Sequence, residues 1–419
     1  MNRKLIKVGF LMTLVGVMGG GMGYVFQILM GRMLGPQDFA LFAAIMSVAV
    51  VMMSPISAVF TVVSRNITQA SVLDRYSFVR RTYSRFMSIN ILGSILLFGF
   101  SSLFASEIGS YIKNSSELQV ALLVGIISVS SFGMLNNSFL QGGQRYLWLA
   151  GTGLSTVTLK IILAVGFVWM GYGVDGALLG ALLSALTANI AVMFVVKSGA
   201  PSLSDSQDPA SLCKVVFNME RLFPVLVANV CMSIMMQLDV LLVHNFFTTA
   251  DASKYAAAAT LGKAILYLPG GLVLALFPMV AEAQARKSRV GTYIFTASAM
   301  TLGMCLAGVL FYWLAGEFLI RQFFGEKYVG AEEILKYYSL AMIPMALLIV
   351  TEYFMMALGK VIFAWLTFFF APIQVIIIYF YHDNLFRVIA TVGISGLILL
   401  FCGYLFLFRL IGAKLRFSE

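Results

Sequence analysis

The chain has 419 residues, of which 60% are hydrophobic and 11% are charged, and its mean hydropathy is +0.94. A soluble domain carries about a quarter charged residues, so this composition excludes a soluble globular protein and predicts an integral membrane protein. The net charge of +10 could suit nucleic acid. However, the placement of the basic residues relative to the membrane explains it, and no nucleic-acid partner is expected.

Twelve segments are long and apolar enough to cross a bilayer, because a spanning helix needs about 20 apolar residues. The segments are unbroken rather than alternating, which excludes a transmembrane barrel and leaves helices to satisfy the backbone in lipid. The predicted fold class is an all-α integral membrane protein with about twelve transmembrane helices. The predicted spans are 8–31, 39–63, 86–106, 118–140, 148–170, 174–196, 222–246, 255–280, 292–316, 334–357, 362–381 and 387–408.

The N-terminus has the basic start and apolar run of a signal peptide, but the run continues to about Gly31, too long for a signal core. We therefore interpret it as the first span, uncleaved. The stretch "GGGMG" (19–23) lies midway along this span. Gly19, Gly20 and Gly21 could form a hinge or allow close helix packing, and the sequence favours neither.

The basic residues set the orientation of the spans. With the N-terminus inside, 19 of them lie on the inner side and 7 on the outer side, and two more, Lys160 and Lys263, lie within spans. The positive-inside rule therefore predicts a multi-pass protein with both termini cytoplasmic. The basic inner face also suits the anionic headgroups of membrane lipids.

One long polar loop, 197–221, divides the spans six and six. We expect an N-terminal six-helix lobe at 1–197, a flexible cytoplasmic linker at 198–221 and a C-terminal six-helix lobe at 222–419. The halves echo each other weakly, in "FAAIMSVAVVMMSP" (42–55) and "YAAAATLGKAILYLP" (255–269). Because each half has an even number of spans, the two repeats would have parallel orientation.

Motifs of enzymes and metal proteins are missing from the sequence. It has no GxxxxGK[ST] phosphate loop and no HExxH, its four cysteines show no CxxC spacing, and its two histidines lie far apart. We therefore expect no catalytic residue, no metal site and no cofactor, and the chain is not expected to be an enzyme.

Charged residues within spans are the informative ones, because each costs about 2.5–3.5 kcal/mol on insertion scales and usually faces a cavity or a partner. Asp239 and Lys263 lie at matching depths in neighbouring spans, about 12 Å below the outer surface at 1.5 Å per residue. They are predicted to pair, either structurally or as a pair that rearranges. Lys160, near the midplane without an acidic partner, is expected to face a water-filled cavity. Glu352, near the inner end of its span, is expected to reach water.

Three stretches carry a resemblance to a known family: "GRMLGPQDFALFAAIMSV" (31–48), "QLDVLLVHNFFTTADASKYAAAATL" (237–261) and "FFGEKYVGAEEILKYYSLAMIPMALLIVTEYFMMALGK" (323–360). In this order on twelve spans they resemble bacterial polysaccharide-biosynthesis transporters. These are lipid-linked oligosaccharide flippases of the O-antigen and capsule type. They belong to the superfamily that also holds multidrug and toxin extrusion pumps.

The resemblance implies two lobes around a central cavity that opens alternately inward and outward in the bacterial cytoplasmic (inner) membrane. It implies an oligosaccharide on undecaprenyl pyrophosphate as substrate, with cationic cavity residues at Lys160, Lys263 and Arg32. Asp239 matches an acidic position of the family's seventh span. Because Asp239 and Glu352 are the acidic residues well inside the predicted spans, a coupling ion would use one of them.

Two other functions are weighed against the flippase. An ion-coupled small-molecule exporter of the multidrug and toxin extrusion type would need an acidic, aromatic cavity, whereas the charged residues well inside the predicted spans are two basic and two acidic ones. A membrane-bound polymerase would be expected to have a large outer loop, and 317–333 is short. Polysaccharide polymerase and glycosyltransferases are possible partners, and a monomer is the default expectation.

Overall fold

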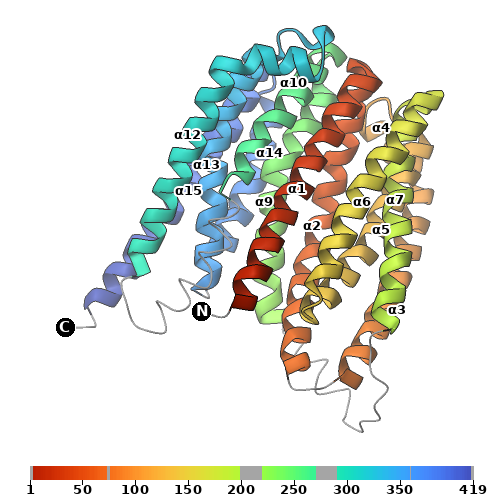
Figure 1. Cartoon of the computed structure of the whole chain (residues 1–419). Coiled ribbons are helices and arrows are strands. Elements are labelled where there is room, and N and C mark those ends of the chain that lie inside the picture. Colours follow the sequence, from red (N-terminus) through yellow and green to blue (C-terminus); the bar gives the residue numbers. More distant parts are fainter. Residues whose placement is uncertain (1–2, 73–75, 199–218, 270–289, 359, 417–419) are drawn as a thin grey trace. The chain divides into compact units, whose positions relative to one another are not determined.

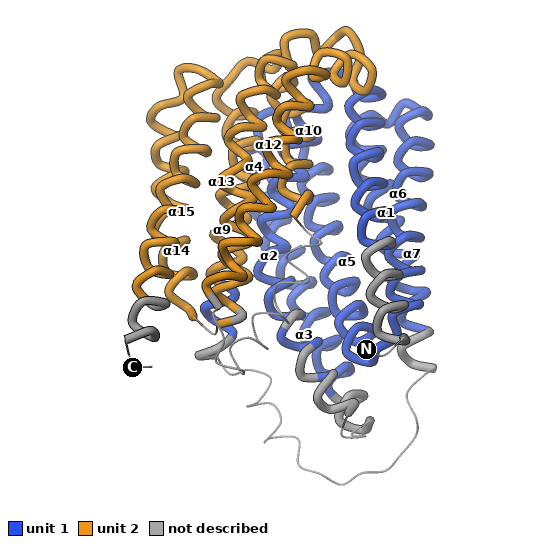
Figure 2. Tube along the Cα trace, turned by 60° about the vertical axis from the view of Figure 1, so that its left-hand side comes forward, with its two compact units in different colours: residues 1–226 blue, residues 227–419 orange. Residues whose placement is uncertain are grey.

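The computed structural model describes the backbone of residues 3–72, 76–198, 219–269, 290–358 and 360–416, and every regular element in these ranges is helical (Figure 1). The chain divides into two compact units, unit 1 at Met1–Leu226 and unit 2 at Val227–Glu419, which Figure 2 colours separately. The predicted linker lies just before this division. Residues 199–218 fall outside the described part, so the linker and the lobe boundaries stay predictions.

Unit 1 is built around the helix α5, which packs against α2, α3 and α7, while α6 packs against α1 and α7. Its apolar core near one end of these helices brings together Phe60, Tyr83 and Phe139 with neighbouring aliphatic side chains. The elements of unit 1 are α1 (Arg3–Leu34), α2 (Pro36–Val72), α3 (Tyr76–Leu103), α4 (Ala105–Tyr111), α5 (Glu117–Gly142), α6 (Tyr146–Phe167), η1 (Val168–Tyr172) and α7 (Gly173–Ser198).

Unit 2 is built around the helix α13, which packs against α10, α12 and α15, while α14 packs against α15. Two thirds of the α13 span is buried, the largest share among the described spans. The elements are α9 (Met219–Phe246), which begins in unit 1, α10 (Thr249–Gly262), η2 (Lys263–Tyr267), α12 (Val290–Phe323), η3 (Glu326–Tyr328), α13 (Ala331–Ala357), α14 (Ile362–Phe380) and α15 (Leu385–Arg416).

Within the described residues, nine helical stretches are long and apolar enough to cross a membrane. One of them, Tyr146–Phe194, runs through a sharp turn and contains both the fifth and the sixth predicted spans. The first predicted span lies within α1. The eighth begins with α10 and η2, and its remainder falls in 270–289, outside the described residues. The helices therefore agree with the twelve predicted spans.

The turn between α6 and α7 depends on two glycines. Gly171 has a φ of +92° and Gly173 a φ of +51°, a left-handed region that side chains with a Cβ rarely adopt. The turn folds α7 back along α6, where Gly180 lies so close that a Cβ on it would be 2.4 Å from the backbone N of Ala164. Small residues at this crossing let the two helices pack closely.

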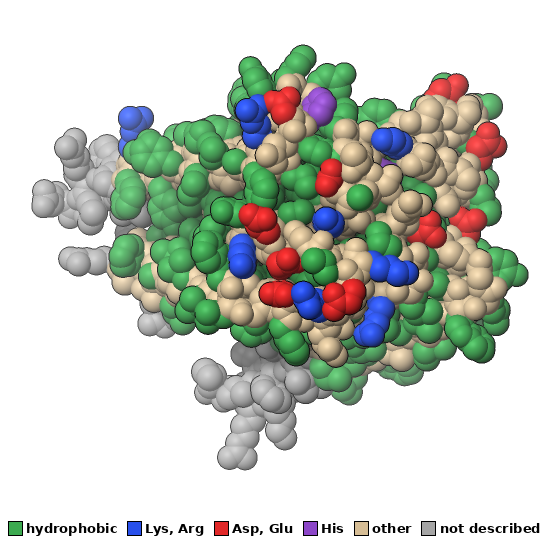
Figure 3. Space-filling model, turned by 90° about the horizontal axis from the view of Figure 1, so that it is seen from above, with side chains coloured by type: hydrophobic (Ala, Val, Ile, Leu, Met, Phe, Trp, Pro, Cys, Tyr) green, Lys and Arg blue, Asp and Glu red, His purple; other side chains and the backbone are tan. Residues whose placement is uncertain are grey.

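Polar caps begin several helices at their exposed ends. Ser116 forms a capping box with Gln119 at the start of α5, and the Thr248 hydroxyl accepts a hydrogen bond from the Asp251 backbone N–H at the start of α10. Figure 3 views the helix ends from above and shows acidic and basic side chains interspersed there, with hydrophobic side chains around them. Charged groups at helix ends and apolar groups along the spans suit a membrane protein.

Candidate functional site

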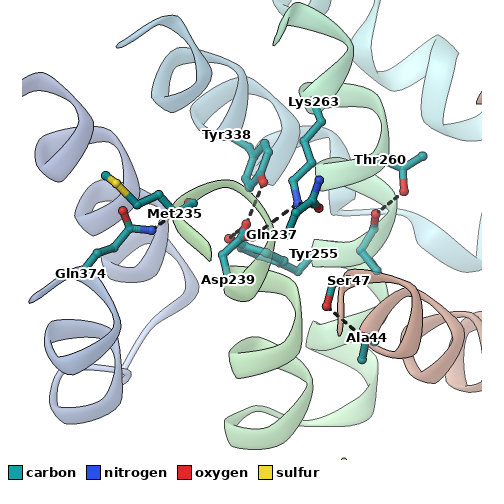
Figure 4. Close-up of polar contacts among 11 residues, drawn as sticks. Ala44, Ser47, Met235, Gln237, Asp239, Tyr255, Thr260, Lys263, Tyr338 and Gln374 are labelled. Carbon is teal, nitrogen blue, oxygen red and sulfur yellow. Dashed lines mark hydrogen bonds and ion pairs between the residues drawn. The ribbon is translucent and has the colours of Figure 1, made fainter. Parts of the chain in front are cut away.

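The predicted pair of Asp239 and Lys263 is the centre of a buried polar cluster in unit 2. The Lys263 Nζ lies 3.4 Å from the Asp239 Oδ1, and the two side chains are 11% and 1% exposed. The structure therefore confirms that these charges face each other, as their matching depths predict. Figure 4 shows the two side chains pointing toward each other from α9 and η2.

Two tyrosines complete the surroundings of the carboxylate. The hydroxyls of Tyr255 and Tyr338 donate to the Asp239 Oδ2 at 2.9 and 2.7 Å. The two rings meet edge to face, with centroids 5.5 Å apart, and both side chains are fully buried. Since a buried charge is tolerated only when it is paired and hydrogen-bonded, these contacts explain how α9 can carry a carboxylate inside a span.

Lys263 is held mainly by an amide rather than by the carboxylate. Its Nζ donates to the Gln237 Oε1 at 2.9 Å, shorter than its 3.4 Å contact with Asp239. A charge-assisted hydrogen bond of this type is usually about 2.7–2.9 Å long. The cluster is therefore a neutral ion pair with three hydrogen-bonding partners: the two tyrosine hydroxyls stabilise the anion and Gln237 stabilises the cation.

The backbone at the end of α10 places Lys263 within reach of this cluster. The helix changes to a 3₁₀ turn at Lys263, and the Tyr312 hydroxyl donates to the Leu261 carbonyl at 2.7 Å. A Cβ on Gly262 would lie 2.5 Å from the Tyr338 ring, so the glycine leaves room for that tyrosine to reach Asp239. Gly262 and Tyr312 therefore position the end of the helix.

Lys160 of unit 1 has an aromatic partner. Its Nζ lies over the Phe26 ring, 4.3 Å from the centroid, and in the described part of the chain it makes no ion pair. A cation over a ring is worth about 0.5–1 kcal/mol when exposed and about 2 kcal/mol or more when desolvated. The Lys160 side chain is partly buried and Phe26 is buried. The ring stabilises the charge without cancelling it.

Glu352 differs from its expected surroundings. It lies on α13 and is only 8% exposed, so the interpretation that it reaches water from the span boundary is wrong. The cause is the dense packing of α13 within unit 2. Among the described residues, no hydrogen bond or ion pair is found for this carboxyl group, whereas Asp239 has three partners. Of the two predicted coupling residues, Asp239 is therefore paired and hydrogen-bonded, whereas Glu352 is buried without either kind of contact among the described residues.

The remaining predicted site residues lie on α1. Arg32 is exposed in the last turn of the helix, six residues after Phe26. The helix continues without a break through Gly19, Gly20 and Gly21, and a Cβ on any of them would meet nothing within 4 Å among the described side chains. Close packing does not explain these glycines in this structure, and the hinge stays a prediction. No metal-binding group of three or more His, Cys, Asp or Glu occurs among the described residues.

Sequence reasoning missed the partners of the charged residues. Tyr255 and Tyr338 lie in the stretches that carry the internal echo and the family resemblance, but the sequence pattern does not predict that either of them, or Phe26, contacts a charged residue. A tyrosine in an apolar span needs a partner for its hydroxyl, so the two tyrosines carried a usable signal. Phe26 carried none, because a phenylalanine in a span is ordinary.

Solved structures with this fold are membrane transporters. An inward-facing multidrug resistance MATE family transporter of the MOP superfamily has a TM-score of 0.82, is 15% identical, and the match covers 98% of this chain and all of that one. A MOP superfamily transporter from Pyrococcus furiosus has a TM-score of 0.72 at 16% identity, covering 97% and 96%. The lipid II flippase MurJ has a TM-score of 0.71 at 14% identity, covering 95% and 87%.

These similarities show the fold, an all-α membrane fold of about twelve helices in two six-helix lobes. The solved proteins with this fold are described as transporters and, for MurJ, as a flippase. A family model described as "Polysaccharide biosynthesis protein" matches residues 5–284, about two thirds of the chain. The chain belongs to this polysaccharide biosynthesis protein family. No curated protein matches the sequence.

Proposed function

We propose that the protein translocates an oligosaccharide linked to undecaprenyl pyrophosphate, an O-antigen or capsule repeat unit, across the bacterial cytoplasmic membrane. Movement occurs by alternating access, and both termini are cytoplasmic. The observation that carries the proposal is Lys160, a cation in a membrane span of unit 1 that is held by a ring and not by a carboxylate. An uncompensated cation inside a membrane is costly, so a substrate anion is the natural reason to keep it.

The structure separates the three basic residues expected to bind the pyrophosphate. Lys263 is engaged by Asp239 and Gln237 and buried, so its charge is already balanced. Lys160 is the remaining cation within a span, and it can pair with phosphate oxygens through charge-assisted hydrogen bonds. Arg32, exposed near the outer end of α1, would meet the headgroup at a different depth. We therefore assign the central contact to Lys160.

Coupling to an ion is assigned to Glu352 rather than to Asp239. Asp239 already has a cation and two hydroxyl donors around it. Glu352 is a buried carboxyl group without such partners in the described part of the chain, so it can accept a proton or a cation without displacing one. The role of Asp239 is then to hold α9, α10 and α13 together.

The alternative is an ion-coupled small-molecule exporter of the multidrug and toxin extrusion type. The observation that favours it is the same Glu352, which is buried without a hydrogen-bond or ion-pair partner among the described residues, since a buried carboxylate is what a cationic substrate would need. The two functions differ in the residue that would bind the substrate. In the flippase Lys160 binds the anionic headgroup, whereas in the exporter Glu352 binds the cationic substrate.

The deciding experiment follows the substrate. The gene is deleted, the lipid-linked oligosaccharide is labelled, and the intact repeat unit is assayed on each leaflet together with surface polysaccharide. The flippase predicts a repeat unit trapped on the cytoplasmic leaflet. The wild-type protein clears this trapped repeat unit, Lys160→Arg clears part of it and Lys160→Ala does not clear it. The control Lys327→Ala, which changes an exposed lysine, behaves as wild type. Normal surface polysaccharide with no trapped intermediate, in a strain without a second flippase, would contradict the proposal.

Polysaccharide polymerase and glycosyltransferases, as enzymes that use the same lipid-linked oligosaccharide, are the protein partners proposed for the chain. Membrane lipids surround it, and we propose that it acts as a monomer.

A further inference from the structure

The two units share a register along their first two helices. α2 begins at Pro36 after Gly35, and α10 begins at Thr249 after Thr248. The first helical hydrogen bond of each follows the same spacing, Phe39 N to Gly35 O at 3.0 Å and Ala252 N to Thr248 O at 2.9 Å. If Gly35 is aligned with Thr248, the residues on either side of Gly35 each correspond to one residue of unit 2, and the alignment needs no insertion or deletion.

This register strengthens the weak echo between the two halves. Asp38 in the first turn of α2 is equivalent to Asp251 in the first turn of α10. Phe42 is likewise equivalent to Tyr255, and each is followed by two alanines. Phe42 and Tyr255 are both fully buried. We use the word "equivalent" below for positions related in this way.

In the preceding helices the register makes Phe26 equivalent to Asp239. Each lies sixteen residues before the buried aromatic residue of its unit. The aromatic residue touches it in both units: the Phe42 ring meets the Phe26 ring edge on, with centroids 5.9 Å apart, and the Tyr255 hydroxyl donates to Asp239 at 2.9 Å. The same structural position is apolar in unit 1 and acidic in unit 2.

Both equivalent positions hold the lysine that lies in a span of their own unit. Phe26 holds Lys160 from α6, with the Nζ 4.3 Å from the ring centroid, and Asp239 holds Lys263 from η2, 3.4 Å from the Oδ1. The two lysines are not equivalent to each other, since they come from different helices. What the two units share is the position that receives the lysine. The chemistry of the residue at that position decides how much of the lysine's charge remains.

The two residues that receive the lysines leave different net charges. A carboxylate cancels the charge of a lysine, whereas an aromatic face attracts the cation through its quadrupole and leaves the charge at +1. An anion that approaches Lys160 meets an attractive field, while one that approaches Lys263 meets a neutral pair. Both lysine side chains are held in place by a partner, so the two sites differ in net charge and not in how well the lysine is positioned.

We infer that Phe26 is a specificity-determining residue that positions Lys160 with its charge intact, which makes unit 1 the unit that binds the anionic headgroup. The inference rests on the proposed function and deepens it. Unit 2, with Asp239 at the equivalent position, holds its lysine in a neutral pair. An acidic residue at position 26 would give unit 1 the same neutral pair.

The test uses the purified protein in detergent with two probes, undecaprenyl pyrophosphate and the uncharged lipid undecaprenol. The quantity measured is the ratio of their dissociation constants, which reports headgroup recognition separately from lipid binding. We expect Phe26→Asp to lower the preference for the pyrophosphate at least tenfold, to about the level of Lys160→Met. Phe26→Tyr and Phe26→Trp keep an aromatic face and should retain the preference. Phe26→Leu, which fills the space without a ring, should lose part of it.

A phenylalanine that only fills space would give another pattern. Phe26→Leu would then keep the full preference for the pyrophosphate. The larger ring of Phe26→Trp would weaken the binding of both probes to the same extent. Either a wild-type preference in Phe26→Asp or a full preference in Phe26→Leu would overturn the inference, and the Leu variant keeps the test decisive if the Asp variant fails to fold. A wild-type protein that binds both probes equally would instead reject the anionic site of the proposed function itself.

Discussion

Asp239 and Lys263 face each other inside the membrane-spanning part of unit 2, with the Oδ1 and Nζ atoms 3.4 Å apart and almost no exposed surface. Removing one partner of a buried pair leaves an uncompensated charge, which costs about 3–5 kcal/mol. We therefore expect Asp239→Asn and Lys263→Met each to lower the melting temperature of the purified protein strongly. The double variant should be much less destabilised than the sum of the two.

The exposed pair of Arg387 and Asp383 provides the control for this cycle. An exposed ion pair contributes about 0–1 kcal/mol, so Asp383→Asn should leave the melting temperature close to that of wild type. Strictly additive effects of Asp239→Asn and Lys263→Met would show that the two charges do not interact in the folded protein.

The hydroxyl of Tyr338 should contribute to stability through Asp239. Tyr338→Phe removes its 2.7 Å hydrogen bond to the carboxylate and keeps the ring, and a hydrogen bond to a charged group is worth about 1.5–3 kcal/mol. The neighbouring Tyr337 is 46% exposed, so Tyr337→Phe is a matched control that should be neutral. Thermal unfolding of both variants, repeated in an Asp239→Asn background, measures the effect. A loss for Tyr338→Phe that stays the same in that background would contradict the assignment.

Charge and hydropathy along the sequence were enough to predict the spans and one contact within the site. The Asp239–Lys263 pair followed from depth, because consecutive spans joined by a short loop must lie side by side. Contacts between distant spans could not be predicted in this way: Tyr338 is 99 residues from Asp239, and Lys160 and Phe26 lie on the sixth and first helices of the structure. Depth also could not predict the burial of Glu352, which depends on how other helices pack around α13.

Gly180 should be essential for the packing of α6 and α7. A Cβ there would lie 2.4 Å from the N and Cα of Ala164, and a backbone cannot move aside as a flexible side chain can. We expect Gly180→Ala to destabilise unit 1 by about 1–3 kcal/mol, the usual cost of overpacking. Gly166→Ala on α6 meets nothing within 4 Å among the described side chains and should be neutral or stabilising, since alanine is the better helix former. Equal melting temperatures for the two variants would show that the helices can separate without cost.

Glu352 should respond to substitution in the opposite sense to Asp239. Both carboxyl groups are buried, but Asp239 is bound by an ammonium group and two hydroxyls, whereas no hydrogen bond or ion pair to Glu352 is found among the described residues. Replacing an unpartnered buried carboxyl group with a neutral amide of the same shape removes no attractive contact and removes the cost of burying the charge. We therefore expect Glu352→Gln to melt at or above the wild-type temperature, while Asp239→Asn melts well below it.

The same Glu352→Gln variant tests the coupling role assigned to this residue. Appearance of the repeat unit on the outer leaflet is followed with the proton and sodium gradients intact and then collapsed, in wild type, Glu352→Gln and Glu333→Gln, the last an exposed glutamate on the same helix. If Glu352 carries the coupling ion, its amide variant translocates slowly and no longer responds to either gradient, while Glu333→Gln follows wild type. A Glu352→Gln variant that keeps the wild-type rate and gradient response would show that transport does not use this carboxyl group. A Glu352→Gln variant that is less stable than wild type would show that the carboxyl group gains a partner in another conformation of the transporter.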